Sequence, residues 1–163
     1  MIAPVFLGLL FATFEVSLRF FASQVLETAT QDAARTVLTG RAQSNYLPDC
    51  PSAAPCSPAD KFKNYLCDKV PGGVLFDCSR FYIDIRSYKQ FNLVQLDSHI
   101  GADGGFVPTM QYDPGGPGDI VVVRVFYEWP TFVTRLGFNL ANLANGNQLL
   151  VATATFKNEL YQF

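Results

Sequence analysis

Residues 1–40 read MIAPVFLGLLFATFEVSLRFFASQVLETATQDAARTVLTG, and this stretch decides the fold. Its first 14 residues carry no charge, and the first acidic and basic residues are Glu15 and Arg19. Further along, apolar residues recur at helical spacing with polar residues between them. The pattern predicts one helix from about Ile2 to Thr39, roughly 57 Å long, with Gly40 as its C-terminal stop. Its first half is hydrophobic on all sides and its second half is amphipathic.

The first half of this helix has the length of a membrane span. A helix needs about 20 residues to cross the hydrocarbon core, and Ile2 to Ala22 meets that length. Twelve Leu, Ile, Val and Phe side chains contribute about −5 kcal/mol to insertion, whereas two charges at mid-bilayer would cost about 5–7 kcal/mol. Glu15 and Arg19 lie in the final third, on one helical face, where they can pair and reach the interface. We therefore predict modestly favourable insertion of a stem, residues 1–23.

Two other interpretations of this segment stay open. An apolar helix of this kind also occurs in the core of globular proteins. A cleaved signal peptide is the second alternative, although Met1 to Leu10 contains no basic residue and no clear cleavage motif precedes Gln24.

Composition limits the functional classes. The chain has 163 residues, which suffices for one domain with an appended segment. Apolar residues make up 49% and charged residues 16%, so the chain can bury enough surface to fold. The net charge of −2 offers no positive surface for phosphate backbones, which argues against nucleic-acid binding.

The remainder, residues 24–163, is predicted to form an α+β head. A short helix is expected at Ala59–Lys69 and another at Thr131–Asn145. Strands are expected at Phe81–Tyr88, Ile120–Trp129 and Leu149–Asn158. Successive strands with few crossover helices favour an antiparallel sheet packed on the long helix. An aromatic cluster is expected in the core: Phe126, Tyr127, Trp129 and Phe132.

Four cysteines predict a disulfide framework outside the cytoplasm. The chain has no C-x-x-C pair and one histidine, His99, so its cysteines do not follow zinc-site spacing. We favour Cys50–Cys56 and Cys67–Cys78 among the three possible pairings. These bridges close loops of seven and twelve residues and would contribute about 2.4 and 2.8 kcal/mol in the chain-entropy model. Reduced core cysteines in a cytosolic protein are the alternative.

The sequence offers little that is typical of catalysis. No glycine-rich loop carries a phosphate-binding signature. His99 follows Asp97 and Ser98 and is more typical of a solvated turn than of a triad. The Gly/Asp loops between Gly101 and Asp119 lack EF-hand spacing, so we interpret them as turns rather than as a calcium site. Most of the scattered carboxylates are expected at the surface or in turns: Asp84, Asp97, Asp103, Asp113, Asp119 and Glu128. We predict no enzyme activity, no metal and no cofactor.

Three stretches carry a resemblance to a known family. The first is IAPVFLGLLF from Ile2, continuing to Phe21, and the second is VLETATQDAAR from Val25, continuing to Gln43. The third runs from VFYEWP at Val125 to ATATFKNE at Ala152–Glu159. With these stretches the chain resembles the TadE/TadG-like, pilin-related proteins of the tight-adherence (Flp) pilus system.

The resemblance implies a type IV pilin-like minor pilin or pseudopilin. Such a protein sits in the bacterial inner membrane as a single-pass protein, with its C-terminal head in the periplasm or incorporated in a surface pilus. Its partners would be the lipid bilayer, other pilin or pseudopilin subunits and the pilus assembly machinery, and it would take part in pilus assembly and adhesion. The family's leader and cleavage site would lie just before Ile2, so we expect either a truncated or misassigned start or an unprocessed copy.

Four stem and helix residues are candidates for assembly contacts. Glu15 and Arg19 are expected to pair within one helix or between helices, and the small Ala29 and Ala33 would admit close packing of the head or of a neighbouring helix. A membrane-tethered periplasmic binding or adhesive domain that uses the loop from Gly101 to Asp119 is the alternative function. A membrane-anchored hydrolase is a weaker one.

Overall fold

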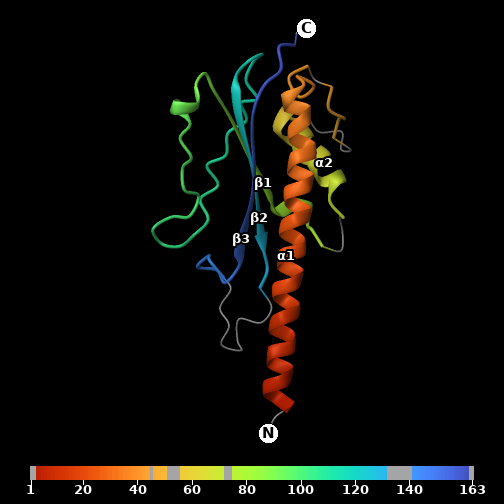
Figure 1. Cartoon of the computed structure of the whole chain (residues 1–163), viewed down its shortest axis with the longest axis vertical. Helices are drawn as coiled ribbons and strands as arrows, with labels where there is room; N and C mark the ends of the chain where they lie inside the picture. Colours follow the sequence, from red (N-terminus) through yellow and green to blue (C-terminus); the bar gives the residue numbers. More distant parts are fainter. Residues whose placement is uncertain (1–2, 45, 51–55, 72–74, 132–140, 162–163) are drawn as a thin grey trace.

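The computed structural model describes residues 3–44, 46–50, 56–71, 75–131 and 141–161, and it confirms the α+β class (Figure 1). One long helix lies along one face of a three-stranded antiparallel sheet, and a shorter helix packs beside it. The elements are α1 (Ala3–Leu38), α2 (Pro58–Lys69), β1 (Phe81–Tyr88), β2 (Ile120–Trp129) and β3 (Gln148–Lys157), with short 3₁₀ helices η1 (Cys78–Arg80) and η2 (Phe91–Leu93).

The single long helix is confirmed, and it ends next to Gly40 as predicted. Gly40 has φ +76°, a left-handed conformation that ends a helix at low cost only for glycine. Its N–H donates to the carbonyl of Val37 at 3.1 Å, and the N–H of Ala42 donates to the carbonyl of Thr36 at 2.9 Å. A Cβ at Gly40 would lie 2.7 Å from the ring of Tyr161, so the position also lacks space for a side chain.

The sheet has the order β1-β2-β3 and is antiparallel throughout. At its centre Ile83 pairs with Val125, which pairs with Ala152 on the other side. Alternate residues of β2, such as Val123 and Val125, belong to the main core against α1. The residues between them, such as Phe126, belong to a second cluster on the opposite face. Because both faces of β2 are covered, its sequence is apolar almost without interruption.

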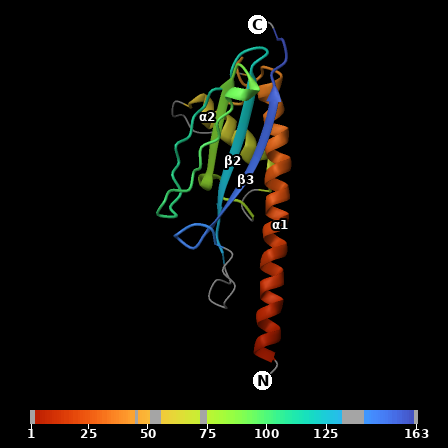
Figure 2. The same ribbon diagram turned by 60° about the vertical axis from the view of Figure 1, so that its left-hand side comes forward.

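The second half of α1 packs on the sheet through small residues. One stripe of the helix is buried: Ala22, Leu26, Ala29, Ala33 and Val37. α1 packs on the sheet mainly through β3 and to a lesser extent through β2, and it also contacts α2 (Figures 1 and 2). Ala29 (3% exposed) and Ala33 (fully buried) therefore pack inside the head of the same chain, and their small side chains let the helix lie close to the strands.

The long connection between β1 and β2 covers the other face of the sheet. It packs Phe106 and Met110 against Tyr82 and Phe126. The Phe106 and Tyr82 rings meet edge-on, with centroids 4.8 Å apart. This connection gives the head a second, smaller apolar cluster.

The cysteines come together as two pairs beside α2. Cys50 with Cys56, and Cys67 with Cys78, each have Cα atoms 5.9 Å apart, the separation of a disulfide. A capping box between Ser57 and Asp60 begins α2 immediately after Cys56. The favoured pairing thus has the Cα separation that disulfides require.

The predicted helix at Thr131–Asn145 is absent where the structure describes it, at residues 141–145. These residues form a turn, in which the N–H of Gly146 donates to the carbonyl of Leu143 at 3.0 Å. Gly146 has φ +80°, and Asn145 accepts a hydrogen bond from the N–H of Asn147. Turn-forming Asn and Gly therefore outweighed the helical spacing. Residues 132–140, including Phe132 of the predicted aromatic cluster, lie outside the described residues; Phe126, Tyr127 and Trp129 are buried as expected.

We predict that Ala33→Leu lowers the free energy of unfolding by about 1–3 kcal/mol, because added methylenes would overpack the α1–sheet contact. Gln31→Leu is the matched control, since Gln31 is exposed on the same helix. Urea unfolding of the full-length chain in detergent, followed by circular dichroism, measures both. Equal stabilities for the two variants would contradict the close helix–sheet packing.

We predict further that both cysteine pairs are oxidised in the protein as isolated. Mass spectrometry of unreduced peptides should link Cys50 to Cys56 and Cys67 to Cys78. The double variant Cys67→Ser/Cys78→Ser should lose about 2–3 kcal/mol of unfolding free energy, because its unfolded chain is less constrained. Recovery of four free thiols from undenatured protein would refute this prediction.

Candidate functional site

The first half of α1 exposes apolar side chains on all sides. Among the described residues, most of the large apolar side chains with high exposure lie on this half of the helix: Val5, Phe6, Leu7, Leu9, Leu10, Phe11, Phe14, Leu18, Phe20 and Phe21. Phe6 and Phe20 are each 61% exposed. Figure 1 shows this part of α1 extending away from the sheet. An apolar surface of this extent is typical of an interface with lipid or with other proteins.

The dimensions of this surface match a bilayer. The described part of the stem, residues 3–23, spans about 32 Å at 1.5 Å per residue, against about 30 Å for the hydrocarbon core. Within the described residues, α1 is the one helix long and apolar enough to cross a membrane, with a mean hydropathy of 1.7 over an 18-residue window within Val5–Leu38. The core helix of a soluble protein is mostly buried, whereas only 11% of the apolar window is buried here.

Two hydroxyl groups of the stem form hydrogen bonds within the helix. Thr13 donates its hydroxyl to the carbonyl of Leu10 at 2.8 Å, and Ser17 donates to the carbonyl of Thr13 at 2.8 Å. Such bonds to the preceding turn let Ser and Thr lie in an apolar environment without an unpaired donor. The stem therefore presents few polar groups that would require water.

Glu15 and Arg19 have different surroundings in the structure. Glu15 is buried, with 6% of its surface exposed. Arg19 is half-buried, and its guanidinium carbon lies 5.8 Å from the centroid of the Phe20 ring, a cation–π contact. The predicted pairing of these two residues, within or between helices, stays a prediction.

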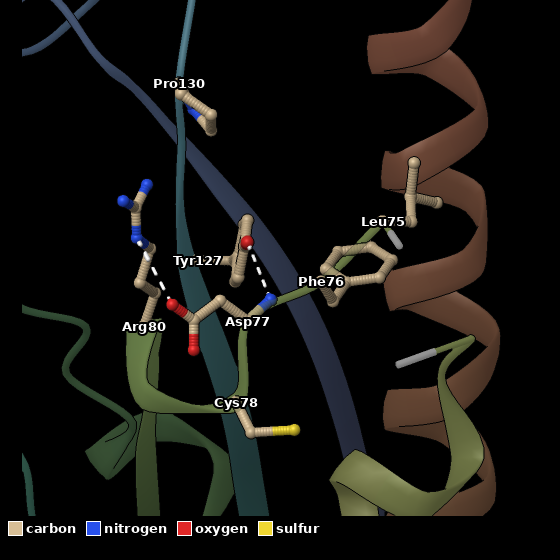
Figure 3. A pocket seen from close by; sticks show the side chains of 7 residues that line it. All are labelled: Leu75, Phe76, Asp77, Cys78, Arg80, Tyr127 and Pro130. Atoms are coloured by element: carbon tan, nitrogen blue, oxygen red, sulfur yellow. Dashed lines mark hydrogen bonds and ion pairs between the residues drawn. The ribbon is translucent and has the colours of Figure 1, made fainter. Parts of the chain in front are cut away.

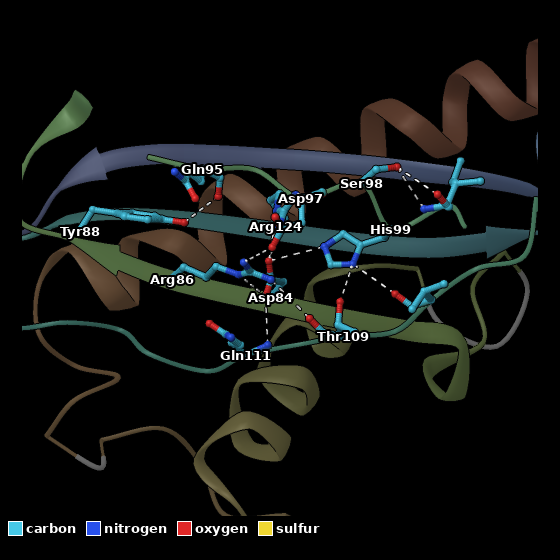
Figure 4. A network of polar contacts seen from close by, with 12 residues as sticks. Asp84, Arg86, Tyr88, Gln95, Asp97, Ser98, His99, Thr109, Gln111 and Arg124 are labelled. Carbon is cyan, nitrogen blue, oxygen red and sulfur yellow. Dashed lines mark hydrogen bonds and ion pairs between the residues drawn. The ribbon is translucent and has the colours of Figure 1, made fainter. Parts of the chain in front are cut away.

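A cluster of polar residues lies between the sheet and the β1–β2 connection (Figure 4). Its centre is Asp84, which is fully buried and pairs across the sheet with Arg124. One carboxylate oxygen accepts from Nε and an N–H₂ group of Arg124. The other accepts from Nε of Arg86 at 3.1 Å and from the backbone N–H of Gln111 at 3.0 Å. The carboxylate is thus saturated with donors.

The two arginines extend this cluster to the connection. Arg86 forms an ion pair with the exposed carboxylate of Asp97 at 2.7 Å. Arg124 donates to the backbone carbonyl of Asp97 at 3.0 Å. The cluster therefore fastens the β1–β2 connection to the sheet, with each charge balanced by a partner.

Sequence reasoning placed Asp84 and His99 wrongly. Asp84 was expected at the surface, and His99 in a solvated turn, but both are buried. Nδ1 of His99 lies 3.2 Å from the carbonyl of Val107, and Nε2 lies 3.8 Å from a carboxylate oxygen of Asp84. Asp84 has its partners 27 and 40 residues away, at Gln111 and Arg124. The one available signal was an acidic residue in the middle of a strand that lay opposite an arginine in the middle of the next strand.

The electrostatics of Asp84 follow from these contacts. Burial alone raises the pKa of this carboxyl, but the hydrogen bonds from Arg124, Gln111 and Arg86 outweigh burial and hold the pKa below its usual range. An ionised carboxylate that accepts four hydrogen bonds is poorly suited to act as a general base. The cluster therefore fits a structural role better than a catalytic one.

The acidic residues of the Gly101–Asp119 loop bind atoms of the loop and its neighbours. Asp103 accepts from the N–H of Gly105 at 3.0 Å, Asp113 accepts from the hydroxyl of Ser87, and Asp119 forms an ion pair with Lys89 at 2.7 Å. The described residues contain no group of three or more His, Cys, Asp or Glu side chains able to hold a metal ion. These carboxylates order turns, as predicted for most of them, but Asp119 is buried rather than at the surface.

An open pocket of about 580 Å³ lies at the end of the sheet near the stem (Figure 3). Its lining includes Asp77, Cys78, Arg80 and Tyr127. The N–H of Asp77 donates to the hydroxyl of Tyr127 at 3.1 Å, and the carboxylate of Asp77 caps η1 through the N–H of Ser79. These polar groups bond to one another and hold η1, with its Cys78, against the sheet.

The segment that matches a known protein family includes the exposed apolar surface of α1. The TadE-like family model matches residues 1–35. The match covers the stem and the following turns of α1, about a fifth of the chain, and confirms the predicted resemblance there. The third stretch of the resemblance, in β2 and β3, lies outside the match. No curated protein and no solved structure matches the chain.

We predict that Asp84→Asn lowers the free energy of unfolding by about 3–5 kcal/mol, because it leaves the buried Arg124 without a countercharge. Asp97→Asn is the matched control: the Asp97 side chain is 64% exposed, so its loss should cost less than about 1 kcal/mol. Equal losses from the two variants would contradict the central place of Asp84.

The depressed pKa of Asp84 also sets a pH dependence. Its stabilising effect is fully present above the unfolded pKa of about 3.9 and is lost as pH falls through the lower folded pKa. Below about pH 4, unfolding stability should therefore decline less steeply with falling pH in Asp84→Asn than in the parent chain. Urea titrations of the full-length chain between pH 2 and pH 7 measure this slope.

Proposed function

We propose that this chain is a non-catalytic, pilin-like subunit that is anchored in the bacterial inner membrane by its stem. Its head lies in the periplasm, and the stem packs against the stems of other pilin or pseudopilin subunits during pilus assembly and adhesion. The observation that carries the proposal is the uncovered, apolar first half of α1, in the same residues that the TadE-like family model matches.

The length and continuity of α1 support the anchoring. Residues 3–23 have the length of a span, and the same helix continues without interruption into the core of the head. Division of the chain into a stem at residues 1–23 and a head at residues 24–163 agrees with Ala22 as the first fully buried apolar residue of the helix.

The cysteine geometry supports a periplasmic head. Two pairs at disulfide separation fit a compartment in which thiols are oxidised, and the bacterial periplasm is such a compartment. A pilin-like orientation, with the C-terminal part outside the cytoplasm, places both pairs there.

Glu15 and Arg19 are the stem residues that we propose for assembly. Charged residues in a span are costly and usually face other protein groups rather than lipid. Glu15 has only 6% of its surface exposed within its own chain, so it faces protein groups of the same subunit rather than lipid. Ala29 and Ala33 support assembly indirectly, because they fix the head closely to the helix that carries the stem.

We predict that Glu15→Leu strengthens membrane insertion but impairs assembly. The change removes a charge whose insertion is costly, and it also removes a group that we assign to stem contacts. Thr13→Leu is the matched control, because it adds an apolar side chain nearby and keeps Glu15. Extraction of membranes with carbonate measures insertion, and counts of surface pili measure assembly.

Photo-cross-linking of the full-length chain in its own cells separates this proposal from tethered recognition. A cross-linker at Phe11 should capture pilin or pseudopilin subunits, and one at Val107 in the loop should not. Capture only through Val107 would favour a membrane-tethered binding domain. Normal piliation of Glu15→Leu would remove Glu15 from the assembly contacts, and a full-length chain recovered without membranes would overturn the anchoring.

A further inference from the structure

The outer edge of β3 carries backbone groups without partners among the described residues. β3 is an end strand of the sheet and pairs with β2 alone. In an antiparallel pair, successive residues direct their backbone N–H and C=O groups alternately toward the neighbouring strand and away from it. The N–H of Asn158, just past β3, donates to the carbonyl of Asp119, just before β2, at 2.8 Å. The backbone N–H and C=O groups of even-numbered residues of β3 therefore point toward β2, and those of odd-numbered residues point away from the sheet.

Two hydrogen bonds mark the ends of this edge. At one end the N–H of Leu149 donates to Oδ1 of Asn142 at 2.7 Å. At the other end the N–H of Glu159 donates to the carbonyl of Leu38, the last residue of α1, at 3.0 Å. Both donors are odd-numbered, in agreement with the alternation. Between them, four outward-facing residues have no backbone partner in the described part of the chain: Val151, Thr153, Thr155 and Lys157.

Except at its last residue, Lys157, the edge of β3 lacks the usual features that prevent pairing. Edge strands of soluble proteins commonly carry proline, inward or outward charges, or bulges. Residues 148–156 contain neither proline nor charge, and the register with β2 runs unbroken over ten pairs. The side chains of Val151 (48% exposed), Thr153 and Thr155 are open to solvent. Their β-branched side chains are the type that pairs best across strands.

The opposite edge of the sheet differs. The N–H of Ile85 in β1 donates to the carbonyl of Gln111 at 2.8 Å, and the N–H of Asp113 donates to the carbonyl of Ile85 at 2.8 Å. The β1–β2 connection thus covers part of the edge of β1 as a short parallel bridge. The described residues cover part of one edge of the sheet and leave the other edge without backbone partners between Val151 and Lys157.

We propose that the open edge of β3 binds an extended segment of a second protein, which joins the sheet as a fourth strand. Backbone hydrogen bonds to the four outward residues would supply the affinity, and the side chains would supply the selectivity. The bound segment would carry uncharged, β-branched residues opposite Val151, Thr153 and Thr155. It would carry an acidic residue opposite Lys157, the one charged residue of β3.

A second copy of β3 does not fit this edge when the stems share one bilayer, as proposed above. β3 runs in the same direction as α1, because Glu159 meets Leu38 at the far end of both (Figure 2). Two copies in one membrane would therefore offer parallel strands. A two-fold axis along the membrane normal would place each residue of β3 at the same height as its copy in the second chain. Parallel strands, in contrast, form their hydrogen bonds when the facing residues are offset by one position.

A synthetic peptide tests the edge directly. The probe is an acetylated, amidated peptide of sequence Glu-Val-Thr-Val-Thr-Val-Thr, whose Glu meets Lys157 when the peptide runs antiparallel to β3. It is added to the full-length, ¹⁵N-labelled chain in detergent, and amide exchange is followed by nuclear magnetic resonance. We expect the amides of Val151, Thr153 and Thr155 to exchange at least about tenfold more slowly at saturation. The amides of Ala152 and Ala154, already paired with β2, should change little.

Three variants make the test specific. Thr153→Pro removes one outward N–H, which an edge strand tolerates, and should weaken binding at least about tenfold. Thr153→Ala keeps that N–H and should bind within about threefold of the parent chain. Lys157→Glu should weaken binding of this peptide, and a peptide with Lys in place of Glu should restore it. If Thr153→Pro does not fold, a peptide N-methylated at the amides that face β3 replaces it and should not bind.

Several outcomes would overturn the proposal. These are unchanged exchange at the odd-numbered amides, equal binding of the N-methylated peptide, and protection of those amides in peptide-free samples as the chain is concentrated. The last outcome identifies a second copy as the occupant. None of them alters carbonate extraction or cross-linking through Phe11, so failure here is distinguishable from failure of the proposed function.

Discussion

The structure depends on one helix that meets two different environments. Along its first half, α1 carries large apolar side chains that the described part of the head leaves uncovered, and along its second half it buries a stripe of mainly small residues against the sheet. The hydrophobic effect favours burial of both halves, but the described residues bury only the second half. The match of residues 1–35 to the TadE-like family lies across the boundary between these halves. The head therefore has a fixed position relative to the exposed, apolar stem.

Local sequence patterns predicted the helices and strands whose apolar residues recur at regular spacing or in continuous runs. α1 and its end at Gly40 followed from helical spacing and from the need for a left-handed residue. β1 and β2 began and ended where their β-branched and aromatic runs do. The segment before β3 was different, because helical spacing of a few leucines competed with Asn and Gly, and the turn at residues 141–146 followed the turn-forming residues.

The polar cluster could not be predicted in the same way. Asp84 is an acidic residue in a strand, and its burial depends on Arg124 lying directly opposite in β2 and on Gln111 returning from a long connection. Both facts are properties of strand register and loop path rather than of neighbouring residues. Glu15 shows the same limit, since its position on the helix was clear and its burial was not. Whether a charged residue within an apolar segment is buried thus depends mainly on tertiary contacts.

Because α1 is uninterrupted, a tilt of its first half also moves the head. From Ala3 to Leu38 it is a rod of about 54 Å, and the sheet is fixed to its upper half through Ala29, Ala33 and their neighbours. Spanning helices commonly lean by about 20° from the normal, and a change of about 10° would swing the top of such a rod sideways by roughly 9 Å. In a bilayer, as proposed for the stem, small changes of helix tilt would therefore become large displacements at the far end of the strands, without any hinge.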